Sequence, residues 1–553
     1  MMKHIRKFIF VSGGVISGIG KGITTASIGR LLQAKGYRVT AMKIDMYLNM
    51  DAGTIRPAEH GEVFVTEDGV ETDQDLGNYE RFLETNLARA NYCTTGQVYA
   101  EVLRKERAFD YDGEDVEAIP HVTDEIIRRI ELALSANEAE IVLIELGGTV
   151  GEYQNALFFE AARIMKLRSP DDVVQVHVGY LPIPTNLGEM KSKPVQQSVK
   201  LLNSMGIQPD LIIGRAEVEI DSRRRERLAL FCNVRPEDVI SNPDVGSIYE
   251  IPLIFEAQKV AEKVLEKLHL PVRSQDMKEW RDLVRTIQSV TKPVKIAIIG
   301  KYFTSGDFVL SDVYISVIEA LKHAAWANTL KLELEWVDSL QFEKDPDHVQ
   351  LLKLYDGIVV PGGFGGRGID GIVRAIQFAR EEKIPYLGLC YGMQLAVVEF
   401  ARHVAGLAQA HTTEIENDTP HPVIHVMPDQ EKKLLERNYG ATMRLGAWPC
   451  RILLGTQAYR AYFGQAPRRA EQTLISERHR HRYEVNNAYR AQLEKAGLVF
   501  SGLTPDGKLV EIAELPTTVH PFFVASQFHP EFGSRPMKPH PLFRAFMAAA
   551  KRA

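Results

Sequence analysis

The run Pro385-Tyr-Leu-Gly-Leu-Cys390-Tyr-Gly-Met-Gln394 joins a short apolar segment to a helical one, and it indicates an α/β fold for the second half of the chain. Gly388 and Gly392 flank Cys390, and a tight strand-to-helix turn that presents a side chain needs such small neighbours. The pattern predicts a reactive thiol. A lone cysteine is more often a small buried hydrophobic residue, so this interpretation depends on partners elsewhere in the sequence.

Two further segments supply those partners. Far downstream, Gln527-Phe-His-Pro-Glu-Phe532 places a histidine and a carboxylate two residues apart, and Pro530 favours an extended backbone that projects both to one side. The pair is typical of a base and the acid that orients it. The glycine-rich turn 359–365 follows a buried strand, where backbone N–H groups could face an oxyanion. Together, the three segments favour nucleophilic catalysis.

Composition narrows the class of protein. At 553 residues, the chain is too long for one core, and 45% hydrophobic and 25% charged residues are ordinary for a soluble globular protein. The net charge of −6 offers no general basic field for nucleic acid. The four cysteines are far apart without metal-site spacing, which favours a reducing cytoplasm. No apolar run reaches the length of a membrane span, and residues 7–12 read as a first strand rather than a signal peptide.

Short apolar strands alternate with longer amphipathic segments, as in parallel α/β sheets. The expected strands are residues 7–12, 38–44, 140–146, 173–180 and 210–214, then 294–300, 356–360, 385–390 and 522–528. We predict two α/β domains, 1–270 and 294–553. The linker 271–293 begins at a proline, contains a polar helix and ends at a proline.

The first domain contains a candidate phosphate site. After the strand 7–12, a loop rich in glycine opens a helix and contains Lys21, so backbone N–H groups and a cation would face the phosphates of a nucleoside triphosphate. The loop is not a strict Walker A motif: Gly14 lies one residue too far from Gly20, and Gly22 replaces the usual Ser or Thr. A plain strand-turn-helix is the alternative.

Acidic and basic residues elsewhere fit the same chemistry. Glu145 ends an apolar strand and Asp75 lies in an acidic stretch, so both are candidate Mg²⁺ ligands, although either alone would read as a surface carboxylate. Lys191 and Lys193, next to Pro194, point the same way in an extended segment and suit a second polyphosphate; two solvated lysines are the alternative. The run 223–225 of three arginines is better explained as a charged helix face or an interface than as a nucleic-acid patch.

Taken together, these segments resemble the CTP synthase family of glutamine-dependent enzymes that aminate UTP. The resemblance extends from Gly13 to about Phe546. Its longest stretches are His60 to Gly69, Thr94 to Gly96, Arg104 to Glu106, Gly147 to Gly151, Lys191 to Gln196, Phe231 to Val234, Thr442 to Gly446, Glu477 to Asn486 and Gln527 to Phe532. The resemblance implies a P-loop-like parallel-sheet synthetase domain followed by a class I glutamine amidotransferase domain with a flavodoxin-like fold.

For the second domain, the resemblance implies that Cys390 attacks the carboxamide of L-glutamine, with His529 as base and Glu531 orienting it. The implied glutamine-binding residues are Gly362 and Gly363 at the oxyanion hole, Glu414 and Arg482 at the charged ends of the amino acid, and Tyr391, Gly392, Met393 and Gln394. A guanidinium and a carboxylate suit a zwitterion.

For the first domain, the resemblance implies ATP and UTP sites side by side. The ATP residues would be Gly18, Ile19, Gly20, Lys21, Gly22, Ile23, Asp75 and Asp244, with Mg²⁺ on Asp75 and Glu145 and with Lys43 near the transferring phosphate. UTP and CTP would use Ser17, Glu152, Tyr153, Gln154, Lys191, Ser192, Lys193, Gln196 and Arg227. His60 would lie along the passage of ammonia.

The implied reaction belongs to pyrimidine nucleotide biosynthesis. ATP phosphorylates the uracil 4-oxygen of UTP, and ammonia from glutamine then displaces the phosphate to give CTP. GTP is implied as an allosteric activator, CTP as a feedback inhibitor and a homotetramer as the active assembly.

The sequence departs from the family pattern in four places. Glu152-Tyr153-Gln154 replaces a stretch with one more acid where the family reads CTP, Glu117 replaces a glutamine, and Arg227 replaces a lysine. The segment 425–441 looks short. The changed stretch 152–154 bears on feedback inhibition by CTP, and the short segment bears on the strength of activation by GTP.

Two alternatives remain at this point. An amidotransferase acting on a carboxylate of a cobalamin precursor would keep both domains, although the Lys191 to Gln196 motif argues against it. A non-catalytic scaffold or filament protein would keep the fold, although the intact candidate catalytic residues argue against that.

Overall fold

The computed structural model describes residues 5–186, 188–300, 304–305, 308–309, 311–427, 430, 440–466 and 469–551. The chain divides into two compact units. The first comprises residues 1–52 and 75–285, and the second comprises 53–74 and 286–553. The short segment 53–74 therefore belongs to the same unit as the second half of the sequence.

The first unit is built on a parallel sheet in the order β5-β2-β6-β1-β7-β8-β9, as far as the residues are described. Its strands are β1 (Lys7–Gly14), β2 (Val39–Asp45), β5 (Tyr92–Thr94), β6 (Ile141–Leu146), β7 (Val173–Tyr180), β8 (Leu211–Ala216) and β9 (Val239–Pro243). Strands β1, β2 and β6 are buried almost throughout, as expected for a sheet covered on both faces. The prediction of a parallel α/β domain is confirmed.

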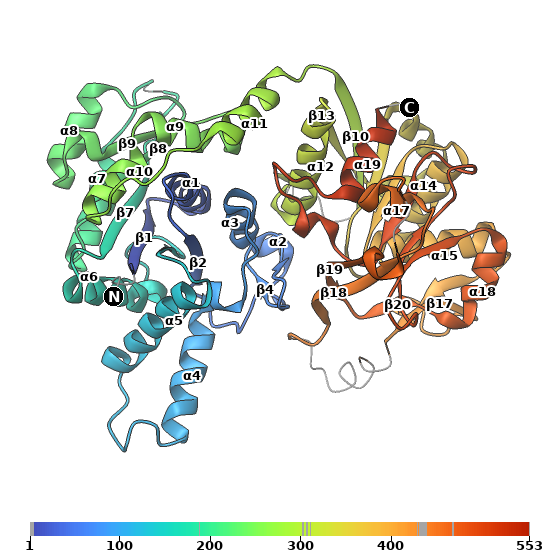
Figure 1. The fold of residues 1–553 in the computed structure, drawn as a ribbon, viewed down its shortest axis with the longest axis horizontal. Helices are drawn as coiled ribbons and strands as arrows, with labels where there is room; N and C mark the ends of the chain where they lie inside the picture. Colours follow the sequence, from blue (N-terminus) through green and yellow to red (C-terminus); the bar gives the residue numbers. More distant parts are fainter. Residues whose placement is uncertain are drawn as a thin grey trace. The chain divides into compact units, whose positions relative to one another are not determined.

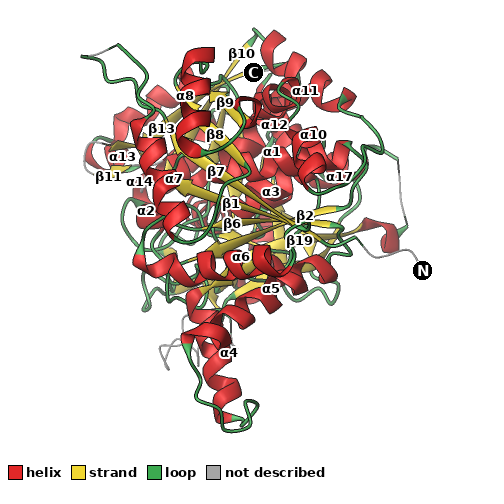
Figure 2. Cartoon of the chain, turned by 90° about the vertical axis from the view of Figure 1, so that its left-hand side faces the viewer, coloured by secondary structure: helices red, strands yellow, loops and turns green. Residues whose placement is uncertain are grey.

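Helices cover both faces of this sheet (Figures 1 and 2). The helices are α1 (Lys21–Ala34), α3 (Asp75–Leu83), α4 (Thr95–Arg107), α5 (Thr123–Ala136), α6 (Ala156–Arg168), α7 (Lys193–Ser204), α8 (Ser222–Cys232), α9 (Ile251–Ala257), α10 (Val260–Lys267) and α11 (Lys278–Ser289), which lies in the predicted linker. α5 and α6 pack on the face that holds Phe8, Phe10 and Met42, while α4 extends away from the sheet. None of the described helices combines the length and hydropathy of a transmembrane span.

The second unit contains a mixed sheet, ordered β13-β10-β14-β15-β23-β22-β21-β18-β19 over the described part of the chain. The strands are β10 (Pro293–Gly300), β13 (Lys331–Asp338), β14 (Gly357–Val360), β15 (Tyr386–Leu389), β18 (Arg444–Ile452), β19 (Leu474–His481), β21 (Val499–Leu503), β22 (Val510–Glu514) and β23 (Phe523–Ser526). Pairing is parallel from β13 to β23 and antiparallel beyond it. The sequence analysis found the parallel strands and missed the antiparallel extension.

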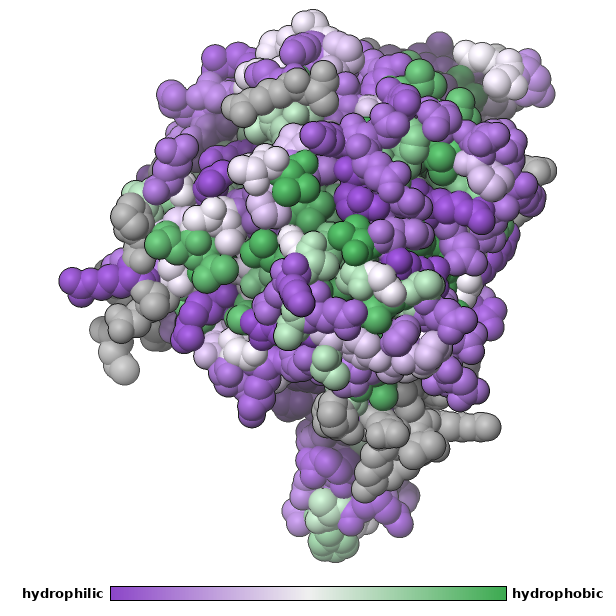
Figure 3. Space-filling model, turned by 90° about the vertical axis from the view of Figure 1, so that its right-hand side faces the viewer, coloured by the Kyte–Doolittle hydropathy of each residue, from purple (hydrophilic) through white to green (hydrophobic). Residues whose placement is uncertain are grey.

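Two hydrophobic clusters lie on opposite faces of this mixed sheet. α14 (Ile369–Glu381) and α15 (Tyr391–His403) belong to one cluster, and α12 (Ile315–Ala327), α17 (Gln457–Phe463) and α19 (Pro541–Ala550) belong to the other. The remaining elements include α2 (Pro57–His60), α13 (Leu340–Lys344), α18 (Asn487–Ala496), the short strand pairs β3 (Phe64–Val65) with β4 (Glu71–Thr72) and β11 (Thr304–Ser305) with β12 (Phe308–Val309), and the sheet of β16 (Ala410–Thr412), β17 (His421–Val426) and β20 (Tyr483–Val485). On the face that Figure 3 draws, hydrophobic residues form small groups among hydrophilic ones.

Candidate active sites

Cys390 occupies the sharp turn between β15 and α15. Its φ of 50° is strained for a residue with a side chain, and its N–H donates to the carbonyl of Ser526 at 2.6 Å. A Cβ on Gly392 would lie 2.2 Å from the carbonyl oxygen of Val360, and one on Gly388 would lie 2.9 Å from that of Gly392. The turn therefore requires glycine on both sides of the thiol, which is the geometry of a nucleophile elbow.

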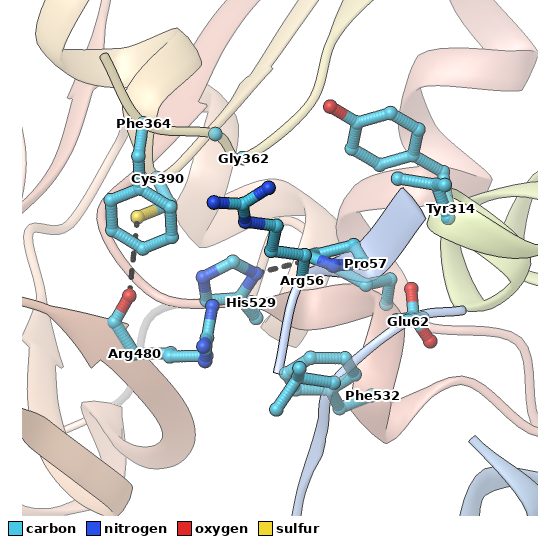
Figure 4. Close-up of a pocket in the computed structure, with 14 residues that line it drawn as sticks. Arg56, Pro57, Glu62, Tyr314, Gly362, Phe364, Cys390, Arg480, His529 and Phe532 are labelled. Atoms are coloured by element: carbon cyan, nitrogen blue, oxygen red, sulfur yellow. Dashed lines mark hydrogen bonds and ion pairs between the residues drawn. The ribbon is translucent and has the colours of Figure 1, made fainter. Parts of the chain in front are cut away.

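His529 and Glu531 form a buried pair, and Figure 4 shows His529 in the same pocket as Cys390. Nδ1 of His529 and Oε1 of Glu531 are 2.6 Å apart, and the imidazole stacks on Phe532 with ring centroids 5.1 Å apart. Burial lowers the pKa of His529, but the charges of Glu531 and Cys390 outweigh burial and raise this pKa to about 10. The imidazole is thus held in the protonated form, as expected for the partner of a thiolate.

A cavity of about 420 Å³ opens onto these residues. It is lined by Arg56, Pro57, Glu62, Val63, Val313, Tyr314, Gly362, Gly363, Phe364, Cys390, Arg480, His529, Glu531 and Phe532. A Cβ on Gly362 would lie 2.8 Å from Cε1 of His529 and 3.8 Å from Cβ of Cys390. Glycine at this position therefore lets the backbone approach the nucleophile and its base, where N–H groups suit an oxyanion.

The segment 53–74 forms one wall of this cavity. The carboxylate of Glu62 accepts hydrogen bonds from the backbone N–H of Ser316, at 3.2 Å, at the start of α12. Glu71 is fully buried and pairs with Arg480 at 2.8 Å, and Phe64 packs edge-on against Phe532. The sequence analysis placed this segment in the first domain and missed these roles, because they depend on contacts between residues that are more than 250 positions apart in the sequence.

The predicted glutamine-binding residues divide into two groups. Gly362 and Gly363 line the cavity, whereas Glu414 and Arg482 do not. Glu414 accepts the N–H of Gly365 at 2.9 Å, and the hydroxyl of Tyr391 donates to the carbonyl of the same glycine at 3.0 Å. In this structure Glu414 therefore holds the glycine-rich loop.

Arg482 is buried and donates to Gln430 and Thr442, each at 2.8 Å. Gly392, Met393 and Gln394 lie in the buried first turn of α15. Residues 428–429 and 431–439, within the segment that looked short, lie outside the described residues.

In the first unit, Lys21 begins α1 directly after the glycine-rich loop. Its Nζ donates to the carbonyl of Gly148 at 2.9 Å, and burial lowers its pKa. Gly20 has a φ of 86°, which favours glycine. A Cβ on Gly22 would lie 2.0 Å from Oδ1 of Asp75. Glycine thus stands where Walker A motifs have Ser or Thr because the Asp75 carboxylate needs that space.

Asp75 and Glu145 converge on Lys43. Nζ of Lys43 lies 2.5 Å from Oδ2 of Asp75 and 2.9 Å from Oε1 of Glu145, and the hydroxyl of Tyr79 donates to the other oxygen of Glu145. Burial and the negative charge of Asp75 raise the pKa of Glu145 to about 7. Carboxylate oxygens are the hard donors that Mg²⁺ prefers, and a cation would offset the destabilised charge of Glu145, so the two residues fit that ion.

Most of the other predicted nucleotide residues are more exposed, although Gln196 is buried. Lys191 pairs with Glu189 at 2.9 Å, and the side chain of Gln196 donates to that of Ser192 at 3.0 Å. Lys193 is the first residue of α7. These residues lie in one continuous segment that leads into the first turn of α7.

Further along, Arg227 lies over the ring of Phe231 at 5.8 Å, and Asp244 pairs with Arg215 at 2.6 Å. Glu152 accepts from both the N–H and the hydroxyl of Thr149 at 2.6 Å. Its neighbour Tyr153 is 96% exposed.

The remaining predicted residues are Ser17, Gly18, Ile19, Ile23, Gln154 and His60. Ser17 and Gly18 are exposed in the loop, and Ile19 is buried. Nε2 of His60 lies 3.0 Å from Asp73. Whether ammonia passes His60 stays a prediction.

A buried histidine that the sequence did not reveal connects the phosphate loop to α7. His177 on β7 bonds through Nδ1 to the hydroxyl of Ser12, at 2.9 Å, and through Nε2 to that of Ser198, at 2.6 Å. A Cβ on Gly14 would lie 1.5 Å from the Ser198 oxygen. Burial lowers the pKa of His177 to about 4, so the ring is neutral.

Known proteins resemble this chain over nearly its whole length. The family profile described as CTP synthase N-terminus matches residues 7–270, and that of glutamine amidotransferase class-I matches 309–549. The chain is 52% identical to a CTP synthase of Caldanaerobacter subterraneus subsp. tengcongensis over 98% of both chains, and 49% identical to one of Halalkalibacterium halodurans over 99% of both. A solved Trypanosoma brucei CTPS glutaminase domain with bound acivicin is 39% identical and covers 47% of this chain and 94% of its own, with a TM-score of 0.42. The chain belongs to the CTP synthase family.

Proposed function

We propose that this chain makes CTP from UTP, using ATP and the nitrogen of L-glutamine, and that the two sites described above divide the work. The observation that carries the proposal is the presence of both constellations, Cys390 with His529 and Lys43 with its two carboxylates, on a chain about 50% identical over its whole length to CTP synthases. Residues 294–553 would release ammonia, and residues 1–270 would activate UTP.

At the glutamine site, the Cys390 sulfur would attack the carboxamide carbon. Backbone N–H groups at Gly362 and Gly363 would receive the developing oxyanion. The protonated His529 would then donate its proton to the departing nitrogen, so that the C–N bond breaks, ammonia leaves and a thioester remains. Water, deprotonated by His529, would hydrolyse the thioester to glutamate and the free thiol. Glu531 would hold the ring in the required orientation throughout.

At the nucleotide site, the loop before α1 and Lys21 would hold the phosphates of ATP. Asp75 and Glu145 would hold Mg²⁺, which offsets phosphate charge when bound. Lys43 lies between these two carboxylates and would neutralise charge at the transferring phosphate. Phosphorylation of the uracil 4-oxygen creates a good leaving group, and ammonia displaces it as phosphate.

The UTP residues proposed here are those before and within the first turn of α7, Lys191, Ser192, Lys193 and Gln196, together with Ser17 and Arg227. Two lysines near a helix N-terminus suit a triphosphate. We further propose Asp244 for ATP, GTP as an allosteric activator and a homotetramer as the assembly. Glu152, Tyr153 and Gln154 would contact CTP.

One assay tests the proposal. CTP formation from UTP and ATP is measured with glutamine, with ammonium and with GTP varied, on the parent chain and on Cys390→Ala. We expect Cys390→Ala to lose glutamine-driven synthesis and to keep ammonium-driven synthesis. ATP hydrolysis that did not depend on UTP would contradict the proposed acceptor, and glutamine-driven synthesis by Cys390→Ala would contradict the nucleophile.

A further inference from the structure

A glutamine side chain contacts the sulfur of Cys390. Gln527 follows the last residue of β23 and is fully buried. Its Nε2 lies 3.6 Å from Sγ of Cys390, within hydrogen-bonding range for sulfur. His529, two residues after Gln527, is the base of this thiol. The segment that follows β23 therefore presents both groups to the nucleophile.

Neighbouring donors fix which end of the Gln527 amide faces the sulfur. Nε2 of Gln394 donates to the carbonyl of Tyr483 at 2.9 Å and contacts Oε1 of Gln527 at 3.3 Å. The first contact requires the amide nitrogen of Gln394 at that position, since a carbonyl accepts only. Oε1 of Gln527 must then be the acceptor, which leaves its NH₂ group directed at Sγ.

The sulfur thus has two polar neighbours with opposite preferences. The carbonyl of Arg480 lies 3.8 Å from Sγ and accepts from the thiol proton (Figure 4). The NH₂ group of Gln527 donates, so its bond strengthens when the sulfur is negative. With the proton on Nε2 of His529 and the sulfur negative, the bond to Arg480 is lost and the bond from Gln527 remains.

We propose that Gln527 is a catalytic residue of the glutamine site: its amide N–H donates to the Cys390 thiolate, stabilises it and holds Sγ for attack. The proposal rests on the proposed nucleophilic role of Cys390. It also assigns Gln394, predicted above to bind glutamine, the task of orienting Gln527. No electron transfer is involved, and the proton ends on His529 until ammonia leaves.

The test is the pH profile of Cys390 alkylation by iodoacetamide in the full chain, with Cys390→Ala as the background. Gln527→Met removes the donor at similar length, and Gln527→Glu replaces it with an acceptor. We expect the midpoint of the profile to rise by about one pH unit in Gln527→Met and further in Gln527→Glu. Glutamine-driven CTP formation should fall about tenfold in Gln527→Met, and ammonium-driven formation should be unchanged.

Gln457→Met is the matched control, because Gln457 is buried in the same unit and its side chain donates to the carbonyl of Leu515, without a hydrogen bond to Cys390 in the described structure. Its alkylation profile should match that of the parent chain. An unchanged profile in Gln527→Met would overturn the proposal and leave Gln527 with a packing role only.

If Gln527→Met fails to fold, as judged by loss of ammonium-driven synthesis, Gln527→Asn replaces it. That variant keeps the NH₂ group but withdraws it by one methylene, so the same upward shift is expected, and an unchanged profile again overturns the proposal. If Cys390→Ala retained glutamine-driven synthesis, the proposed nucleophile would fail instead, which distinguishes the two results.

Discussion

The glutamine site and the nucleotide site both contain buried ionisable groups with raised pKa values, but the causes are opposite. At His529, opposite charges on Glu531 and Cys390 overcome burial and favour the charged imidazole. At Glu145, burial and the like charge of Asp75 disfavour the charged carboxylate. The first site is therefore arranged for proton transfer by the protein alone, whereas the second gains from a cation that offsets its carboxylates.

The largest expected effect separates the two sites. Glu145→Gln removes the charge that would hold Mg²⁺ while keeping the shape of the side chain, so ammonium-driven CTP formation should fall at least roughly 1,000-fold. Glutaminase activity, measured as glutamate release, should remain within about twofold of the parent. Cys390→Ala is the complementary control, because it should lose glutaminase activity and keep ammonium-driven CTP formation. Equal loss of both activities in Glu145→Gln would mean that the sites are not separable.

Gly22→Ala sharpens the comparison within the nucleotide site. The added Cβ would lie 2.0 Å from Oδ1 of Asp75, so the carboxylate must move away from Lys43. We expect ammonium-driven synthesis to fall about 100-fold, because a displaced catalytic group loses much of its effect. Gly113→Ala, in the same unit but outside the site, is the control, because its added Cβ would make only an ordinary contact of 3.7 Å with Phe109. An effect of Gly22→Ala no larger than that of Gly113→Ala would contradict the role given to Asp75.

The next effect concerns the wall of the glutamine cavity. Glu71→Gln leaves the largely buried guanidinium of Arg480 without its ion-pair partner, and the carbonyl of Arg480 lies 3.8 Å from Sγ of Cys390. Glutamine-driven synthesis should fall about tenfold and the second unit should unfold at lower temperature in calorimetry. Asp282→Asn breaks the exposed pair with Lys278 and should change neither. Normal activity in Glu71→Gln would show that the wall does not position the site.

The smallest effect on activity, but a measurable one on stability, is expected at His177. Its pKa is lowered to about 4 in the folded protein, so the unfolded chain binds an extra proton between about pH 4 and the ordinary value of 6.5. The contribution of His177 to the free energy of unfolding is complete above pH 6.5. It is lost as the pH falls from 6.5 to 4, and the loss reaches roughly 3 kcal/mol at pH 4.

His177→Gln should remove that part of the pH dependence in urea unfolding measured from pH 7 to pH 4. His269→Gln, at an exposed histidine, is the control. An unchanged slope in His177→Gln would contradict the neutral buried ring.

Short sequence patterns predicted those structural features that depend on residues close together in the chain. The apolar strands and the glycines around Cys390 are readable because a tight turn and a buried parallel strand restrict residue type within a few positions. β18 and β19 were missed, since they contain charged residues, among them the buried Arg444 and Glu477, and such residues obscure a strand pattern. The pairing of Glu71 with Arg480 depends on tertiary contact and leaves no short-range signal.

The assignment of residues 53–74 to the second unit has a consequence for biosynthesis. The ribosome makes these residues early, but β19, which packs against β3 and contains Arg480, appears about 400 residues later. Neither unit is formed by one uninterrupted stretch of the nascent chain, because residues 53–74 interrupt the first unit and belong to the second. Domain-by-domain cotranslational folding therefore cannot finish until the last third of the polypeptide has emerged.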